Sequence, residues 1–136
     1  MIFNIVLKST KDDDFSVAES AEEKSISLPP FNYEGGAYPI SHNINRILSQ
    51  YKLSPSEEIS DFMNLGLAVY CSDQLISRAQ YGFFNWSRHF KLHLPVMNKE
   101  LWDNNKELVE QLLSFLSGDK WEIFFRSRNK YFNETL

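Results

Sequence analysis

The chain has 136 residues, of which 43% are hydrophobic and 15% aromatic, so residues 1–136 are expected to form a single globular domain. Its 14 basic and 18 acidic residues give a net charge of -4, so no overall positive field favours nucleic acid as a partner. The single cysteine excludes an internal disulfide and indicates a reducing, cytoplasmic setting. No apolar run approaches the roughly 18 residues that span a bilayer, and the first residues lack a basic leader, so neither export nor a membrane partner is expected.

Two short strands are predicted near the start of the chain. Phe3, Ile5 and Leu7 alternate with more polar residues, and Ile26 and Leu28 alternate with serines, so the second strand is expected to pair with the first. The segment 11–23 between them carries six of the eighteen acids and predicts a flexible, solvated hairpin connection. An acidic site for a metal or a basic partner is the alternative, although the consecutive residues 12–14 lack the spacing of a calcium loop.

A turn-rich loop and two helices follow. Pro29 and Pro30 end the second strand, and the adjacent glycines at 35–36 predict a structural turn rather than a phosphate-binding loop. Residues 43–51 predict a short helix. A longer helix is expected to begin at Ser54 as a capping residue, with Pro55 in the first turn and one apolar face. That face comprises Ile59, Phe62, Met63, Gly66 and Tyr70, and other apolar residues predict burial on more than one side.

The clearest pattern in the chain is a strand, a helix and a second strand between Arg88 and Arg128. Apolar residues alternate with His89, Lys91 and His93 before Pro95, which predicts a strand with one polar face. Asn98 is expected to cap a helix that ends at Gly118, after which alternation resumes through residues 121–126. The apolar residues recur along that helix at Leu101, Leu108, Leu112 and Phe115, with Asn105 at the same spacing. The two strands can be parallel or antiparallel.

The fold class expected from these elements is α+β. We expect a mainly antiparallel sheet of four or more strands, with two main helices packed on it.

Several candidate sites for chemistry have stronger structural explanations. Cys71 lies in a helical apolar pattern and is expected to be a core residue. His89 and His93 lie about 13 Å apart on a strand, so they cannot chelate one metal ion. No nucleophile elbow, Walker loop or dinucleotide fingerprint is present, which leaves an active site of scattered carboxylates without positive support.

Aromatic and cationic residues near the last two strands form the remaining candidate surface. They are able to stack on bases or clamp phosphates, but tryptophan packing and solubilising arginines explain the same pattern. Asp73, near the end of the long helix, is either exposed or paired with Arg78 or Arg88. The candidate binding or docking residues are Arg78, Trp86, Arg88, Asp119, Trp121 and Arg126.

Four sequence runs resemble the N-terminal region of bacterial 7-cyano-7-deazaguanine synthase-like proteins of anti-phage defence, of the Qat type. They are LGLAVYCSDQLISR, NWSRHFKLHLPV, the Leu-Trp pair before the predicted helix, and LLSFLSGDKWEIFFRSR, and together they extend over residues 65–128. In such proteins this region precedes a PP-loop ATP pyrophosphatase domain. The Ser-Gly-Gly-x-Asp-Ser loop and the zinc cysteines of that domain are absent here.

The resemblance implies a non-catalytic accessory domain that docks a partner or presents substrate to a downstream catalytic domain. Its expected partners are that PP-loop domain and another protein of a defence operon. The chain itself is expected to hold no cofactor, because ATP and zinc belong to the downstream domain. The candidate residues above are then either buried scaffolding or docking surface. A free-standing nucleotide-binding or small-molecule-binding protein, or a small hydrolase or transferase, are the alternatives.

Overall fold

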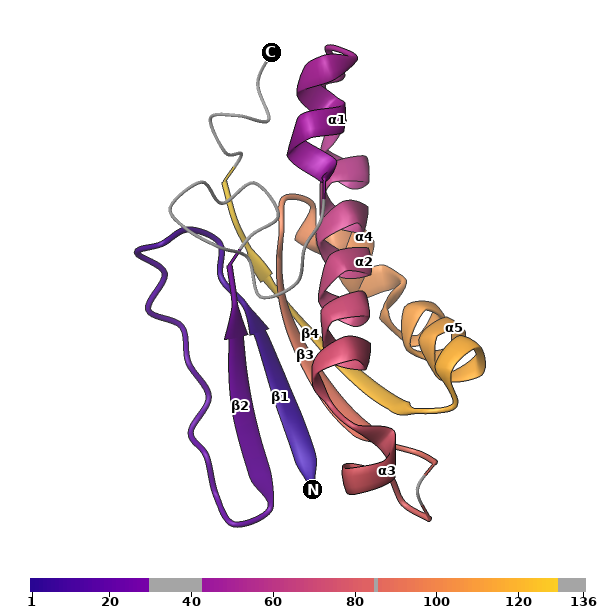
Figure 1. Ribbon diagram of the computed structural model, residues 1–136. Helices are drawn as coiled ribbons and strands as arrows, with labels where there is room; N and C mark the ends of the chain where they lie inside the picture. The colour runs from indigo at the N-terminus through magenta and orange to yellow at the C-terminus, as the bar shows by residue number, and fades with distance from the viewer. Residues whose placement is uncertain (30–42, 85, 130–136) are drawn as a thin grey trace.

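A four-stranded, entirely parallel sheet forms the centre of the molecule, with strand order β2-β1-β3-β4 (Figure 1). The computed structural model describes residues 1–29, 43–84 and 86–129. The predicted glycine turn at 35–36 lies outside these residues. The strands are β1 (Ile2–Leu7), β2 (Glu23–Leu28), β3 (His89–Val96) and β4 (Lys120–Ser127). The helices are α1 (Ile44–Gln50), α2 (Glu57–Leu75), α3 (Arg78–Tyr81), α4 (Lys99–Asn104) and α5 (Lys106–Ser117).

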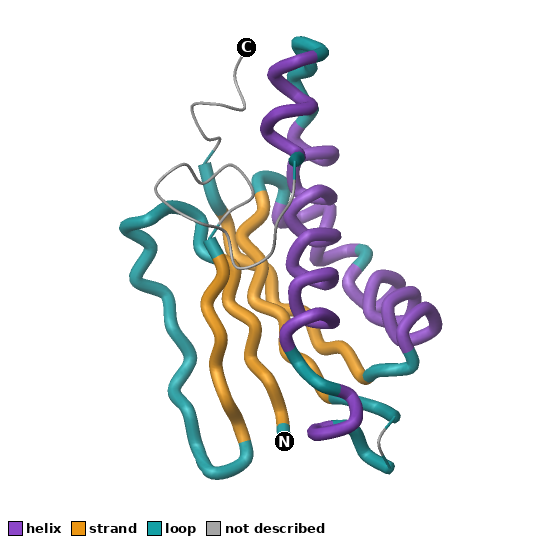
Figure 2. Tube along the Cα trace, viewed as in Figure 1, coloured by secondary structure: helices purple, strands orange, loops and turns teal. Residues whose placement is uncertain are grey.

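The mixed helix-and-strand class and the four strands are confirmed, but the predicted antiparallel pairing is wrong. Every neighbouring pair of strands runs parallel. The segment between β1 and β2 is not a hairpin turn, because it returns along the sheet to start β2 beside the start of β1 (Figure 2). Parallel neighbours need a crossover of about a dozen residues or more, and each of the three connections is long enough.

One face of the sheet forms the hydrophobic core with the helices. Alternate residues of the strands point to this face, where α2 lies against β1 and β3 while α4 and α5 lie against β4. The packed strand residues include Phe3, Ile5, Leu7, Phe90, Leu92, Leu94, Val96, Trp121, Ile123 and Phe125. Cys71 of α2 is fully buried among them, which confirms it as a core residue.

The opposite face of the sheet carries polar side chains together with Phe124, and the irregular connection between β1 and β2 packs on it. His93 stacks on Phe124 and binds the side chain of Asn4 at 2.9 Å. Phe15, from the connection between β1 and β2, lies over the same histidine. Asp13 holds this connection in place through a 2.6 Å ion pair with Arg126 of β4. The flexibility expected for 11–23 stays a prediction, but Asp13 and Phe15 attach its first part to the sheet.

The helix boundaries differ from the expected ones in two places. Ser56, not Ser54, caps α2 by accepting a hydrogen bond from the Ile59 amide. Asn98 caps α4 as predicted, through the Leu101 amide, but the expected single helix breaks at Asn105 into α4 and α5. The left-handed Gly118 that ends α5, with φ of 75°, is confirmed.

Both long helices place their most regular apolar residues toward solvent. On α2, Ile59, Phe62 and Tyr70 are exposed, whereas Leu65, Ala68 and Cys71 face the core. On α4 and α5 the buried residues are Trp102 and Leu113, and the predicted apolar series is exposed: Leu101, Leu108, Leu112 and Phe115. The helical layer therefore has an apolar outer surface as well as an apolar inner one.

Candidate functional site

Asp119 is the centre of a buried ion-pair cluster at the amino end of β4. It follows Gly118 in the turn from α5, and this turn directs its carboxylate back toward Arg88 at the start of β3. Oδ1 accepts hydrogen bonds from the Arg88 backbone amide at 2.8 Å and from Arg88 Nε at 3.2 Å. Oδ2 accepts from the Arg88 guanidinium at 2.8 Å, so the pair is bidentate.

Arg88 links this carboxylate to the carboxyl end of α2. Its guanidinium donates to the Ile76 carbonyl at 2.6 Å and to the Asp73 carboxylate at 2.7 Å. Arg78 donates to Asp119 at 2.9 Å and lies 3.8 Å from Asp73. Asp73 therefore has the arginine partners considered from the sequence, although its side chain stays half exposed.

Electrostatically, this cluster is balanced, since two guanidinium groups face two carboxylates. Burial alone would raise the pKa of Asp119, but hydrogen bonds from Arg88 and Arg78 hold it below its usual range. Burial opposes the charged form of Arg88, yet Asp119 and Asp73 raise its pKa. The cluster therefore has no excess positive charge to offer an anionic ligand.

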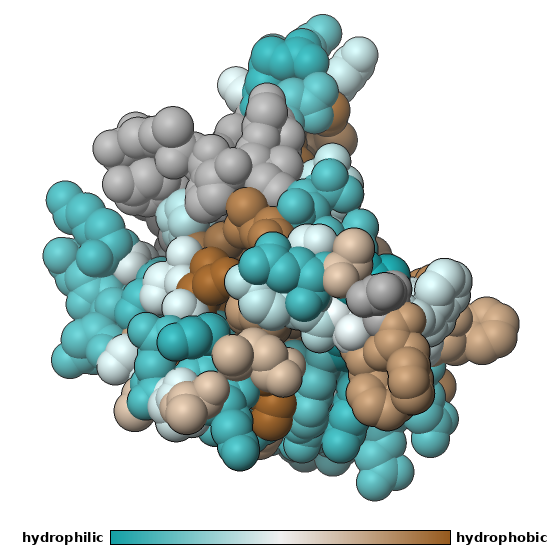
Figure 3. Space-filling model, turned by 60° about the horizontal axis from the view of Figure 1, so that its bottom comes forward, coloured by the Kyte–Doolittle hydropathy of each residue, from teal (hydrophilic) through white to brown (hydrophobic). Residues whose placement is uncertain are grey.

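The same cluster orients an aromatic loop. Arg78 donates to the Trp86 carbonyl and its guanidinium lies 5.5 Å from the centre of the Trp86 ring. A Cβ added at Gly118 would lie 3.0 Å from Trp86 Nε1, so the indole packs directly on this glycine. Phe83 and Phe84 precede Trp86 in the chain, contact each other edge to face and are 71% and 86% exposed. Figure 3 brings this end of the molecule forward and shows hydrophobic residues at its surface.

The structure brings together five of the six candidate residues predicted from the sequence. Arg78, Arg88 and Asp119 bind one another, Trp86 packs beside them, and Trp121 stacks on Phe90 below Arg88. Arg88, Asp119 and Trp121 are buried, so only Arg78 and Trp86 present surface. Arg126 lies on the opposite face of the sheet with Asp13 and belongs to no common surface with the others.

Two cavities lie between α2 and the pair α4–α5, and we call the surface that contains both of them the groove. At the cluster end it opens into a cavity of about 410 Å³, whose floor includes Leu113, Asp119 and Trp121. Tyr70 and Leu116 stand on its two sides, one on each helix, and α2 makes few direct contacts with α5. The sequence-predicted cluster thus forms one end of a larger concave surface.

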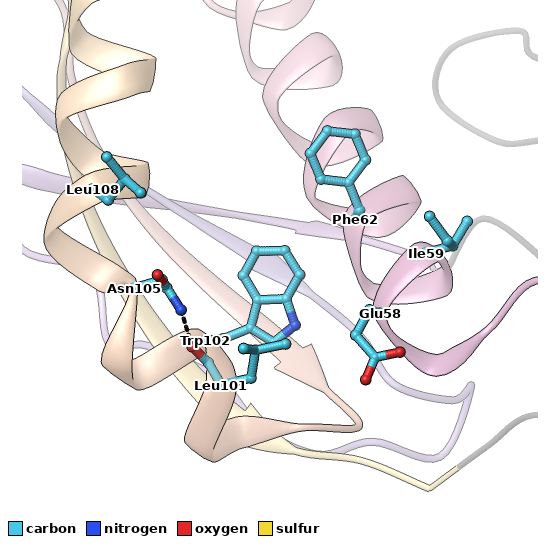
Figure 4. A pocket seen from close by; sticks show the side chains of 7 residues that line it. All are labelled: Glu58, Ile59, Phe62, Leu101, Trp102, Asn105 and Leu108. Atoms are coloured by element: carbon cyan, nitrogen blue, oxygen red, sulfur yellow. Dashed lines mark hydrogen bonds between the residues drawn. The ribbon is translucent and has the colours of Figure 1, made fainter.

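A second cavity of about 350 Å³ lies toward the amino end of α2. Its lining is almost entirely apolar, and Figure 4 shows Trp102 between Phe62 on α2 and Leu108 on α5. The rest of the lining is formed by Glu58, Ile59, Leu101 and Asn105. The side-chain amide of Asn105 donates to the Leu101 carbonyl at 2.8 Å. Because this amide is already paired within the helix, the rim of the cavity is mainly hydrophobic.

Buried Asp61 fixes the tryptophan at the floor of this cavity. Its carboxylate accepts hydrogen bonds from Trp102 Nε1 at 3.1 Å and from the Met97 amide at 2.9 Å. Arg128, also buried, forms an ion pair with it at 3.3 Å. Asp61 therefore ties α2 to the start of α4 and fixes the orientation of Trp102.

The sequence does not reveal this part of the groove, because regular apolar spacing on α2 and α5 predicts residues that face the core. The available signal was an excess of apolar residues, since each helix has enough to face two environments. Phe62 is 60% exposed and Leu108 is 63% exposed, although both lie at regular helical spacing with other apolar residues.

The remaining candidates have structural partners. His89 pairs with Glu122 and His93 with Asn4, and burial raises the pKa of the Cys71 thiol to about 11. Within residues 1–29, 43–84 and 86–129, no group of three or more metal-ligating side chains is placed to hold an ion. Among those same residues, no helix has the length and hydropathy needed to cross a membrane.

Comparisons with protein-family models, with curated proteins and with solved structures found no match to this chain.

Proposed function

We propose that this protein is a non-catalytic docking module that binds a partner protein along the groove between α2 and α4–α5. The observation that carries this proposal is the outward orientation of apolar residues on both sides of the groove, including Phe62 and Leu108. Contiguous exposed apolar surface is uncommon on monomeric proteins and marks sites of interaction.

The groove also has the physical properties of an interface that is formed before binding. Its floor consists of Trp102, Leu113 and Trp121, which are all buried against the sheet and are therefore fixed in position. Binding energy at interfaces concentrates in apolar and aromatic anchors that fill well-packed pockets. Two cavities of roughly equal size offer places for such anchors.

We further propose that the module belongs to a deazaguanine synthase-like protein of anti-phage defence, in which it serves a downstream PP-loop domain. The resemblance supports this placement, and so does the gathering of its motif residues Arg78, Trp86, Arg88 and Asp119 into one cluster. That cluster stabilises the end of the groove. The module would hold no cofactor and would act in the cytoplasm.

A second candidate function is the binding of a small, uncharged molecule. The cavity of about 410 Å³ beside Trp121 has the size of an ordinary ligand site. Its arginines are neutralised by Asp73 and Asp119, which argues against a nucleotide phosphate. Calorimetry with the uncharged base 7-cyano-7-deazaguanine tests this candidate, and ATP and other nucleotides serve as anionic comparisons. Saturable binding of the base, weakened by Arg78→Gln and not matched by the nucleotides, would support it.

The docking proposal is tested by partner capture with variants of the natural full-length protein. Phe62→Ser with Leu108→Ser removes two exposed anchors from the groove, and Tyr51→Ser with Leu53→Ser removes two exposed apolar side chains outside it. We expect the groove variant to lose a specific partner that the control variant retains, with both variants folded. Equal capture by the two variants would contradict the proposal.

A further inference from the structure

The charges on the helices that form the groove are strongly one-sided. All four charged residues of α2 are acidic: Glu57, Glu58, Asp61 and Asp73. On α4 and α5 there are four further acids, Glu100, Asp103, Glu107 and Glu110, against two lysines, Lys99 and Lys106. The three helices α2, α4 and α5 therefore carry eight acids and two bases, a larger imbalance than that of the whole chain.

Internal ion pairs leave this imbalance in place. Asp61 is buried with Arg128, and Asp73 faces Arg78 and Arg88, so these two acids are compensated. Lys99 is compensated as well, because it pairs with Asp103 at 2.5 Å on the exposed surface of α4. Glu57, Glu58, Glu100 and Glu107 form no ion pair within the part of the chain that the structure describes, and Lys106 lies over the Phe124 ring.

The spacing of the two cavities suits a helix as the bound element. Phe62 lines one cavity and Tyr70 lines the other, which places their Cα atoms about 12 Å apart along α2 at a rise of about 1.5 Å per residue. A helix lying along the groove presents apolar residues at i, i+4, i+7 and i+8 over that length, enough to reach both cavities.

Resting on the docking function proposed above, we infer that the groove binds a basic amphipathic helix. Its apolar side chains would occupy the two cavities, and a lysine or arginine would face Glu58, which lines the cavity toward the amino end of α2. The other uncompensated glutamates lie outside the two linings and add to the negative potential around the groove. Complementary charge selects partners and speeds association. A second copy of this chain is a poorer occupant, because it would bring two acidic helical layers together.

Two peptides of about 18 residues, with identical apolar positions and with either lysine or glutamate at the polar positions, provide the test. Fluorescence anisotropy with the full chain measures their affinities. We expect the lysine peptide to bind at least tenfold more tightly at low salt. Glu58→Lys, a change within the groove lining, should reduce this preference more than Glu107→Lys, a change outside it. Phe62→Ser with Leu108→Ser should weaken binding, whereas Tyr51→Ser with Leu53→Ser should not.

The remaining outcomes separate this inference from the docking function. Equal binding of both peptides in the groove would overturn the charge inference and leave docking intact. If neither peptide binds, the charge inference is overturned as well. The docking proposal then stands only if the groove variant loses a natural partner that the control variant captures. Sedimentation that shows a dimer dissociated by Phe62→Ser with Leu108→Ser would replace the inferred partner with a second copy.

Discussion

Asp119 binds Arg88 through both its carboxylate oxygens and accepts the Arg88 backbone amide as well, so one acid fixes the side chain and the main chain of its partner. Both residues are at most 3% exposed. This pair joins the turn before β4, the start of β3 and, through the Ile76 carbonyl, the end of α2. It thereby sets the position of the cluster end of the groove.

Asp119→Asn should therefore destabilise the protein severely. It removes the buried carboxylate of the pair and leaves Arg88 with the half-exposed Asp73 as its remaining counterion, and breaking a buried ion pair typically costs about 3–5 kcal/mol. Asp73→Asn is the matched control, since that carboxylate is half exposed and its loss should cost less than about 1 kcal/mol. Urea unfolding of the three proteins measures the difference. Similar midpoints for the two variants would show that the buried pair does not hold this part of the fold together.

The two glycines on the groove helices should respond oppositely to alanine. Gly118→Ala forces a side chain into a left-handed conformation at φ 75° and within 3.0 Å of Trp86 Nε1, so we expect a loss of about 1–2 kcal/mol and altered tryptophan fluorescence. Gly66→Ala fills open space within α2 and should stabilise the protein by up to about 1 kcal/mol. Thermal unfolding of both variants checks the signs. A destabilising Gly66→Ala would mean that this position is not open.

Stability should depend on pH through His93. Burial, with smaller contributions from Arg126 and Lys91, lowers the pKa of this histidine to about 4. Above that pH the folded state keeps His93 neutral, whereas the unfolded chain protonates near pH 6.5. Between pH 5 and 6.5 the unfolded state therefore binds more protons, and stability should rise with pH by up to about 1.4 kcal/mol per unit.

Urea midpoints measured across this range test the assignment. His93→Gln should flatten the rise, and His89→Gln serves as the control on the same strand. Three carboxylates have pKa values below their usual range. A hydrogen bond from Lys91 lowers the pKa of Glu23, and one from His89 lowers the pKa of Glu122. Burial raises the pKa of Asp119, but hydrogen bonds from Arg88 and Arg78 outweigh it. The stability that these three carboxylates contribute is lost only at lower pH, as the pH falls through their lowered pKa values. A slope that persists in His93→Gln would assign the effect to another group.

Asp13 should protect the connection between β1 and β2 from proteolytic cleavage. Its carboxylate binds Arg126 at 2.6 Å and accepts the Ser9 and Phe15 amides at 2.8 and 3.0 Å. We expect Asp13→Asn to increase proteolytic cleavage within residues 8–22 several-fold without unfolding the sheet. Asp12→Asn, a change at an exposed neighbour, should leave the cleavage rate unchanged. Equal rates for both variants would show that Asp13 does not anchor the segment.

The sequence supports correct local predictions wherever a short-range rule decides the structure. Gly118 ends a helix, Asn98 begins one, and alternation identifies which residues of β3 face the core. Parallel pairing was missed because alternation does not encode strand direction, and a fifteen-residue segment such as 8–22 is able to form either a hairpin or a return crossover.

The candidate site was predictable only in part, for a related reason. Asp119, Arg88 and Arg78 stand out as charged residues near apolar elements, and they do meet. The orientation of α2 depends instead on Asp61, whose partners Met97, Trp102 and Arg128 lie far away in the sequence. Because the side of α2 that carries Asp61 is buried, Ile59 and Phe62 on the other side face outward. Periodicity alone cannot show which side of the helix faces the core.

Photocrosslinking from the groove tests the docking proposal most directly. A benzoylphenylalanine in place of Phe62 retains an aromatic ring at the cavity rim, and the same residue in place of Tyr51 samples an exposed aromatic position outside the groove. In cells that make the natural full-length protein, we predict one dominant adduct from position 62 and none of the same species from position 51. A folded protein that yields no adduct at position 62, or the same adducts at both positions, would contradict the proposal that this groove is a docking site.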